Sequence, residues 1–204
     1  MRLYLVRHGE TESNRQGLAL GRADVSLNER GRWQAQRLDR ARVGEPIAAV
    51  YSSPLSRALD TARPIALSRG LEVQVEPGLI EMDIGEAEGL TFSEVRSRFP
   101  GLLEAWLAAE GPNHPMPGGE RLVDVQTRAW EAAQAVASRH PQEAACAVTH
   151  NFVILSILTR VLGMDLADFR RVRHAVGAVS LLDLRPGRAR LVTLNDTCHL
   201  DAQD

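Results

Sequence analysis

The sequence contains no lysine, so all 24 of its strongly basic residues are arginines. This absence excludes every mechanism that needs a lysine, such as Schiff-base chemistry, a P-loop or the ATP site of a protein kinase. Arginine presents paired, planar donors that match the oxygens of phosphate and carboxylate groups. The composition therefore leaves open an oxyanion site built from guanidinium groups.

Cysteine is scarce, and long apolar runs are missing. Cys146 and Cys198 are the 2 cysteines in 204 residues, and neither belongs to a Cys-x-x-Cys pair. This number gives no disulfide framework and no structural zinc motif. The apolar run Leu3–Val6 is too short for a signal peptide, and no run reaches the roughly 18 residues of a membrane span. We therefore expect a cytoplasmic protein without a membrane partner.

The two signs of charge nearly cancel, with 26 acidic residues and a formal net charge of −2. Such a balance argues against nucleic-acid binding through bulk charge. Hydrophobic residues make up 44% of the chain and charged residues 25%, as in ordinary globular proteins. The length predicts one domain, residues 1–204, with a sizeable core.

Short apolar runs alternate with helical patterns along the chain. Strands are predicted at Leu3–Val6, Ile47–Tyr51, Leu71–Val75, Ala144–Thr149, Val176–Leu184 and Arg190–Leu194, the last two separated by a turn at Pro186–Gly187. Helices are predicted at Asn28–Arg42, Leu55–Ser68, Glu120–Arg139 and Phe152–Leu162. Such alternation predicts an α/β fold, a three-layer sandwich with a largely parallel central sheet and helices on both faces.

Residues 82–118 differ from the rest, because they are rich in glycine, proline and charge. Short helical patterns occur at Phe92–Phe99 and Leu102–Ala109. Loops and small helices over a sheet edge often form lids, so we expect a small lid subdomain inserted here. Apolar residues of this segment, among them Trp106, could line a substrate site or pack on the core, and we favour packing.

Basic or imidazole side chains follow three of the predicted strands. Arg7 and His8 follow the first strand, Arg57 follows the second through Ser-Ser-Pro, and His150 follows the strand at Ala144–Thr149. Since parallel strands bring their carboxyl ends to one edge, we expect these groups to share a pocket. Two arginines, two imidazoles and the adjoining helix N-termini suit a phosphoryl group. A neutral imidazole could itself be the nucleophile, and nearby arginines favour the neutral form.

The motifs around these residues resemble the histidine phosphatase superfamily, which includes cofactor-dependent phosphoglycerate mutases and many phosphatases. The matching segments run in order over nearly the whole chain: Leu3–Thr11 with Asn14, Ser52–Ala58 with Thr61-Ala62, Leu79–Gly85, Pro117–Glu120, Val148–His150, and Asn195 with His199-Leu200. An Arg-His-Gly triplet alone is a weak indication, but this ordered set is specific.

The resemblance implies a role for each site residue. His8 would be the nucleophile and would form a transient phosphohistidine, and Glu81 would protonate the leaving oxygen and then activate water. The remaining expected site residues would hold the phosphoryl group or substrate: Arg7, Asn14, Arg57, His150 and Asn151. Asp83 is an alternative for the acid, although we favour Glu81. Glu10 could be catalytic or a structural partner of an arginine.

The resemblance also favours one branch of the family. The mutase branch carries Trp where this chain has Ser13, and a longer basic insertion where residues 86–117 offer only Arg96 and Arg98. We therefore expect a metal-independent phosphomonoester hydrolase acting on a small phosphorylated metabolite. A phosphoglycerate mutase and a non-catalytic phosphate-binding regulatory module are the alternatives.

The resemblance implies no cofactor and no metal, since a ring of arginine and histidine can replace magnesium in phosphoryl transfer. The expected partner is the substrate alone, without nucleic acid or membrane. Oligomeric state is left open, with a homodimer as one option. His114, His140 and His174 are predicted to be surface or lid residues.

Overall fold

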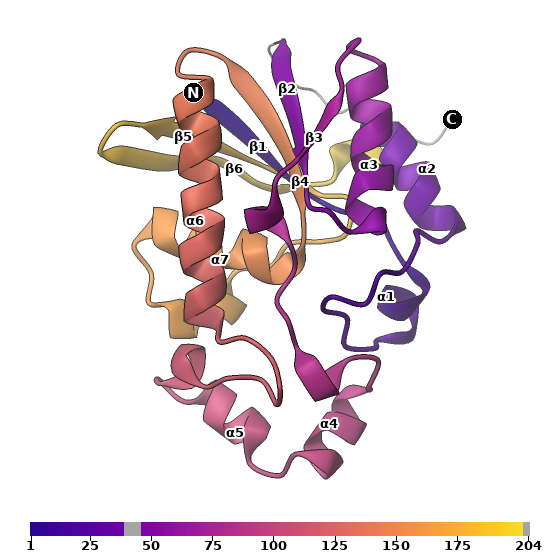
Figure 1. The fold of residues 1–204 in the computed structure, drawn as a ribbon, viewed down its shortest axis with the longest axis vertical. Coiled ribbons are helices and arrows are strands. Elements are labelled where there is room, and N and C mark those ends of the chain that lie inside the picture. Colours follow the sequence, from indigo (N-terminus) through magenta and orange to yellow (C-terminus); the bar gives the residue numbers. More distant parts are fainter. Residues whose placement is uncertain (39–45, 202–204) are drawn as a thin grey trace.

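The computed structural model describes residues 1–38 and 46–201, and its centre is a six-stranded sheet of order β3-β2-β4-β1-β5-β6 (Figure 1). The strands are β1 (Arg2–Arg7), β2 (Ile47–Ser52), β3 (Val73–Val75), β4 (Ala144–Thr149), β5 (Val179–Arg185) and β6 (Arg188–Asp196). The first four are mutually parallel, whereas β5 and β6 add an antiparallel hairpin at one side. The turn between β5 and β6 is too short for a parallel crossover, so the hairpin must be antiparallel. The predicted α/β class is confirmed, with a mixed sheet.

Helices cover both faces of this sheet, as predicted. The α-helices are α1 (Glu12–Gln16), α2 (Glu29–Arg37), α3 (Ser56–Leu67), α4 (Phe92–Arg98), α5 (Leu102–Leu107), α6 (Leu122–Arg139), α7 (Asn151–Leu162) and α8 (Cys198–Asp201). Short α1 and α8 were not predicted, because elements of one turn leave no periodicity. The helix expected at Asn28–Arg42 is present as α2, and the predicted positions 39–42 lie outside the described residues.

The core divides into two clusters, one on each face of the sheet. Leu3 and Leu5 of β1 pack with α6 and α7, whereas Tyr4 and Val6 of the same strand pack with α3. Successive side chains of a strand point to opposite faces, so a strand buried on both faces is apolar throughout. This is why β1 and β4 read as unbroken apolar runs.

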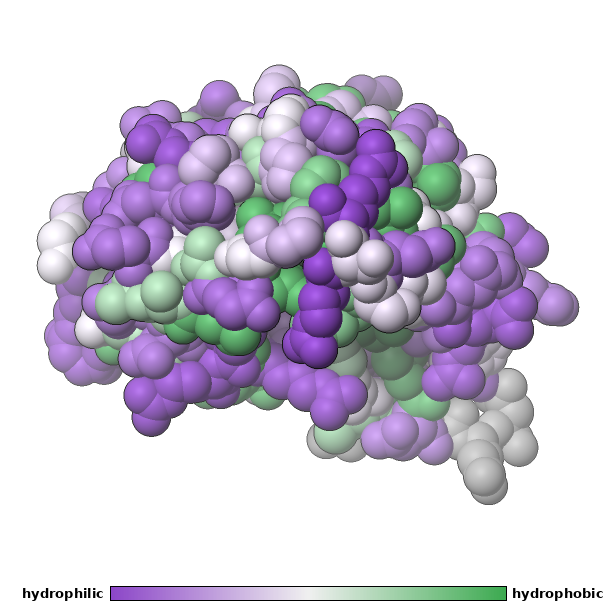
Figure 2. Space-filling view, turned by 90° about the horizontal axis from the view of Figure 1, so that it is seen from below, coloured by the Kyte–Doolittle hydropathy of each residue, from purple (hydrophilic) through white to green (hydrophobic). Residues whose placement is uncertain are grey.

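The segment predicted as a lid lies at one end of the molecule and contains α4 and α5 (Figure 1). Trp106 packs edge-on against Phe152 and Phe169 with ring centroids 6.0 and 6.1 Å away, and it also lines the cleft beside the carboxyl ends of the strands, so both interpretations of this side chain have support. Phe92 instead remains 62% exposed. Seen from this end, the molecule shows scattered apolar residues among hydrophilic ones (Figure 2).

None of the helices within residues 1–38 and 46–201 is long and apolar enough to cross a membrane.

The carboxyl ends of β1, β2 and β4 meet at one edge, as expected for parallel strands. The hydrogen-bonded ladder continues past the strands, since His8 N donates to Thr149 O at 3.0 Å and Ser53 N donates to Val148 O at 3.0 Å. This register places the residues that follow each strand next to one another.

Candidate active site

His8 and His150 face each other at this edge of the sheet, although 142 positions separate them in the sequence. Their ring centroids are 5.0 Å apart, and the two residues are 3% and 0% exposed. Strands β1 and β4 are neighbours, so each histidine occupies the first position after its strand. The predicted convergence of the two imidazoles is therefore present.

Arg7 and Arg57 complete the expected cluster, and backbone carbonyls fix both guanidinium groups. Arg57 donates through Nη1 to Ala23 O at 2.8 Å and through Nη2 to Gly21 O at 2.6 Å. Arg7 donates through Nη1 to His174 O at 2.6 Å. Each guanidinium is thus oriented by groups that do not neutralise its charge.

Three nitrogens of this cluster are buried without a hydrogen-bond partner in the part of the chain that the structure describes: Arg7 Nε, Arg57 Nε and His150 Nδ1. Buried donors without partners are costly and uncommon in folded proteins. The Nε atoms of Arg7 and Arg57 each carry a hydrogen that needs an acceptor. An anion bound in the cluster would supply these acceptors. A phosphoryl group offers acceptor oxygens of this kind.

The electrostatic environment keeps both imidazoles neutral. Burial holds the pKa of His8 well below its usual range, and the positive charges of Arg57 and Arg7 lower it further. Burial likewise holds the pKa of His150 well below its usual range, with further lowering by His8 and the arginines. A neutral imidazole keeps one nitrogen lone pair, which is what nucleophilic attack requires.

The hydrogen bond of His8 shows which nitrogen carries that lone pair. His8 Nδ1 lies 2.7 Å from Gly9 O. A carbonyl oxygen only accepts hydrogen bonds, so Nδ1 carries the proton and Nε2 holds the lone pair. The geometry therefore leaves Nε2 as the nitrogen of this side chain that could act as a nucleophile.

Glu81 is the carboxylic acid of the cluster and is 3% exposed. Burial raises its pKa, against the opposing effects of the Met82 amide and the Arg57 and Arg7 charges. Met82 N donates to Oε1 at 2.9 Å, and Phe152 N, at the start of α7, donates to Oε2 at 3.4 Å. A carboxyl with a raised pKa can give up and take back a proton at moderate pH.

Asp83, the alternative acid, is engaged elsewhere. Its Oδ1 accepts from Gly85 N at 2.9 Å, and its Oδ2 lies 3.7 Å from Arg22 Nη1. Its side chain is 37% exposed, so it lacks the burial that sets Glu81 apart. The geometry favours Glu81 for the acid role.

The predicted asparagines lie at the rim of the cluster, where they line a cleft of about 700 Å³ that also reaches Arg7. Asn151 Oδ1 accepts from Arg7 Nη1 at 3.0 Å. Asn14 Oδ1 accepts from Thr11 N at 3.1 Å, so its amide NH₂ is the part suited to an anion. Glu10 accepts from Asn28 at 2.8 Å and lies 3.9 Å from Arg30 Nε, in agreement with the structural interpretation.

The prediction for His174 was wrong, because this residue is 2% exposed and belongs to the support of the site. Its carbonyl binds Arg7, and its Nε2 lies 2.9 Å from Ser180 Oγ. Sequence periodicity missed it because it lies in a loop after α7. Ser53, 2.7 Å from His150 Nε2, was also given no role, although it directly follows a strand as His8 does.

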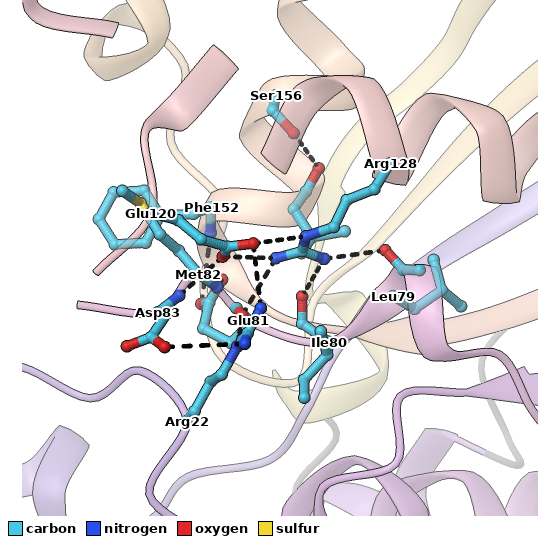
Figure 3. Close-up of polar contacts among 12 residues, drawn as sticks. Arg22, Leu79, Ile80, Glu81, Met82, Asp83, Glu120, Arg128, Phe152 and Ser156 are labelled. Atoms are coloured by element: carbon cyan, nitrogen blue, oxygen red, sulfur yellow. Dashed lines mark hydrogen bonds and ion pairs between the residues drawn. The ribbon is translucent and has the colours of Figure 1, made fainter. Parts of the chain in front are cut away.

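An ion-pair network holds the backbone that carries Glu81 (Figure 3). Arg128 of α6 donates to the carbonyls of Gly78, Ile80 and Glu81 at 3.0, 2.5 and 3.1 Å. Its Nη2 also donates to Glu120 Oε2 at 3.1 Å. Arg128 thus binds main-chain oxygens and the Glu120 carboxylate, but not the carboxyl of Glu81. It fixes the course of the segment and leaves that carboxyl in the cluster.

The same cleft extends beyond the cluster to Arg170, in the 3-10 helix Leu166–Arg171 that follows α7, and to Arg173 just after that helix. Arg170 is held by Trp106 O at 3.1 Å and lies over the Phe169 ring. Arg173 is exposed, and it directly precedes His174, whose carbonyl binds Arg7. The cleft therefore joins the buried cluster to a second group of positive charges.

Comparisons with known proteins agree with this geometry. The model of the histidine phosphatase superfamily (branch 1) matches residues 3–197. Phosphoserine phosphatase 1 of Hydrogenobacter thermophilus is 34% identical over 201 residues, which cover 98% of this chain and 94% of that protein. Metal-independent phosphoserine phosphatase of Arabidopsis thaliana is 31% identical over 98% of this chain and 83% of its own length. The solved structure of Bacillus stearothermophilus YhfR superposes with a TM-score of 0.90 at 31% identity, covering 98% of this chain and 99% of that chain.

Proposed function

Because this chain belongs to the histidine phosphatase superfamily, we propose that it hydrolyses small phosphomonoesters through a covalent phosphohistidine on His8. The observation that carries the proposal is the neutral His8, with its Nε2 lone pair, in a cluster with three unpartnered buried nitrogens. Nucleophile and anion donors lie in one buried place, as phosphoryl transfer requires.

The first step transfers the phosphoryl group to the protein. Nε2 of His8 attacks phosphorus, and the new N–P bond forms as the P–O bond of the ester breaks. Glu81 gives its proton to the departing ester oxygen and becomes a carboxylate. Arg7, Arg57 and His150 bind the non-bridging oxygens, whose charge spreads in the transition state.

The second step releases phosphate. Glu81 takes a proton from a water molecule as that water attacks phosphorus, and the N–P bond breaks with its electron pair returning to Nε2. The carboxyl is then protonated again and the imidazole neutral, so the cycle closes without an outside acid, base or metal ion. The raised pKa of Glu81 supports this double role.

The cleft supports a substrate with a second negative charge. Arg170 and Arg173 line it together with Arg7, and the one acidic lining residue, Glu10, already has partners. A carboxylate on the leaving group would complement these charges. Phosphoserine, the substrate in the name of the Hydrogenobacter relative, carries such a group, so we propose carboxylated phosphomonoesters as the substrate class.

The test is a substrate panel followed by a trapping experiment. We expect hydrolysis of phosphoserine and 3-phosphoglycerate to survive EDTA and to exceed that of ethyl phosphate in kcat/KM. Quenching in alkaline detergent should reveal an acid-labile, base-stable phosphoprotein that is absent from His8→Ala, whose activity should fall about 10³-fold or more.

Other outcomes would replace the proposal. Rapid interconversion of 3- and 2-phosphoglycerate with little free phosphate would identify a mutase. Tight binding of phosphomonoesters without turnover would identify a regulatory module. Activity lost to EDTA and restored by a metal ion would contradict the metal-free mechanism.

A further inference from the structure

We infer that Arg22 is a positioning residue that ties Glu81 to the loop holding Arg57, so that the acid and the phosphoryl-binding arginine keep a fixed relation. The inference rests on the function proposed above. Arg22 lies between two parts of the site that come from distant stretches of the chain, and it contacts both.

The first part is the loop of residues 21–23, which binds Arg57. The carbonyls of Gly21 and Ala23 accept from the two terminal nitrogens of the Arg57 guanidinium. The amides of the same two residues donate to the carboxylate of Glu88 at 2.8 and 3.1 Å. Glu88 and Arg57 thus fix the backbone on both sides of Arg22.

The second part is the segment that carries Glu81, and the Arg22 side chain reaches it directly (Figure 3). Arg22 Nε donates to Glu81 O at 3.3 Å, and Nη2 lies 3.0 Å from Glu120 Oε1. Glu120 Oε2 in turn accepts from Asp83 N at 2.9 Å. The backbone of Glu81 is therefore held by Arg22 of the 21–23 loop as well as by Arg128 of α6.

The partners of Arg22 show that it acts through Glu81 rather than on the substrate. Each nitrogen of its guanidinium has a protein oxygen within 3.7 Å. Loss of the side chain would remove one of the two arginines that donate to Glu81 O, Arg128 being the other. Misplacement of a catalytic group by about 1 Å can cost on the order of 100-fold in rate.

The position of Arg22 makes the test practicable. Its side chain is 38% exposed, so truncation leaves no buried cavity. Arg121 is a matched control, because it is a half-exposed arginine that directly follows Glu120 and pairs with Asp124 at 2.7 Å. Within the part of the chain that the structure describes, its side chain has no recorded bond to either part of the site. Thermal unfolding of each variant would verify folding.

Substrates with different leaving groups isolate the contribution of the acid. The serine alkoxide released from phosphoserine needs a proton, whereas the nitrophenolate released from 4-nitrophenyl phosphate does not. We expect Arg22→Ala to lower kcat/KM, which reports the steps up to loss of the leaving group, about 10- to 100-fold for phosphoserine and less than about 3-fold for 4-nitrophenyl phosphate. The water attack that follows is common to both substrates, so kcat can fall on both. Arg22→Lys, which keeps the charge, should recover part of the loss, and Arg121→Ala should behave as wild type.

Glu88→Gln is the contrasting variant. It weakens the hydrogen bonds that fix the 21–23 loop, which binds Arg57, and it leaves the contacts of Glu81 unchanged. We expect it to raise KM for both substrates and the inhibition constant of inorganic phosphate. Equal losses of kcat/KM on both substrates in Arg22→Ala, or none, would overturn the inference while leaving the proposed function intact. A wild-type chain that hydrolyses neither substrate would overturn both.

Discussion

At the scale of single residues, Ser53 determines which ring nitrogen of His150 carries the proton. Its Oγ accepts from Leu55 N at 3.3 Å and lies 2.7 Å from His150 Nε2. The hydroxyl hydrogen needs an acceptor, and the neutral imidazole provides one at Nε2. His150 then carries its own proton on Nδ1, which is buried without a hydrogen-bond partner among the described residues and could donate that proton to a phosphoryl oxygen.

Replacing Ser53 with alanine should therefore disturb His150 specifically. Without the hydroxyl, Nε2 of His150 loses its hydrogen-bond donor. The tautomer with the proton on Nδ1, which directs that proton toward the substrate, is then no longer favoured. We expect kcat/KM to fall about 10-fold, which corresponds to about 1.4 kcal/mol. The measurement pairs steady-state kinetics with ¹⁵N NMR of the His150 ring.

Ser52→Ala is the control for that experiment. Ser52 is equally buried, but its hydroxyl donates to Ser53 O at 2.9 Å and does not contact the imidazole. The ¹⁵N shifts of His150 should be unchanged in this variant. Unaltered shifts in Ser53→Ala as well would refute the assignment.

At the scale of elements, helix α2 sets the position of the loop that carries His8. A Cβ built on Gly31 of α2 would lie 2.0 Å from Glu10 O, and one built on Gly9 would lie 2.5 Å from Gly31 O. Gln34 of the same helix accepts from Glu10 N at 2.8 Å. The close approach that Gly31 permits is therefore to this loop.

Gly31→Ala should therefore reverse the usual effect of alanine in a helix. Alanine normally stabilises a helix interior by about 1 kcal/mol relative to glycine. Here α2 would have to move away from the loop, so we expect a loss of about 1–3 kcal/mol in unfolding free energy together with a lower kcat. Chemical denaturation and kinetics measure both quantities.

Gln36→Ala, on the exposed face of α2, is the matched variant and should change neither quantity appreciably. If Gly31→Ala proved as stable and active as wild type, the contact would not position the loop.

At the scale of the whole molecule, the buried histidines tie stability to pH. Burial keeps the pKa of His8 and His150 well below the usual range and lowers that of His174 to about 4. In the unfolded chain all three titrate near about 6.5, so between about pH 6.5 and 4 the unfolded state binds more protons there. Stability should therefore fall as the pH falls through this window.

Glu81 opposes this trend, because its raised pKa lets the folded state keep a proton that the unfolded state releases. The histidines outnumber this carboxyl, so the unfolding free energy should still fall as the pH falls toward 5, by up to about 1.4 kcal/mol per pH unit for each net proton that the unfolded state binds in excess. Urea denaturation at pH 5–7 measures the slope. In His174→Asn this slope should be smaller by the contribution of about one proton. A flat profile of stability against pH would contradict the burial of these groups in neutral form.

Local patterns in the sequence determined much of this protein. The apolar runs fixed β1, β2 and β4, and the residues directly after them supplied His8, Ser53 and His150. Because parallel strands share a carboxyl edge, the meeting of the two histidines could be expected without coordinates, and the arginines followed from the same argument.

Only the tertiary structure decided how those groups are held. His174 is buried, Arg22 bridges two loops, and Arg128 binds the backbone before Glu81, and none of these facts follows from local periodicity. Each depends on loops packed together from distant parts of the chain, where a few hydrogen bonds choose the conformation. Strands form through repeated side-chain patterns that a sequence displays, whereas burial and pKa arise from neighbours that only the complete fold brings together.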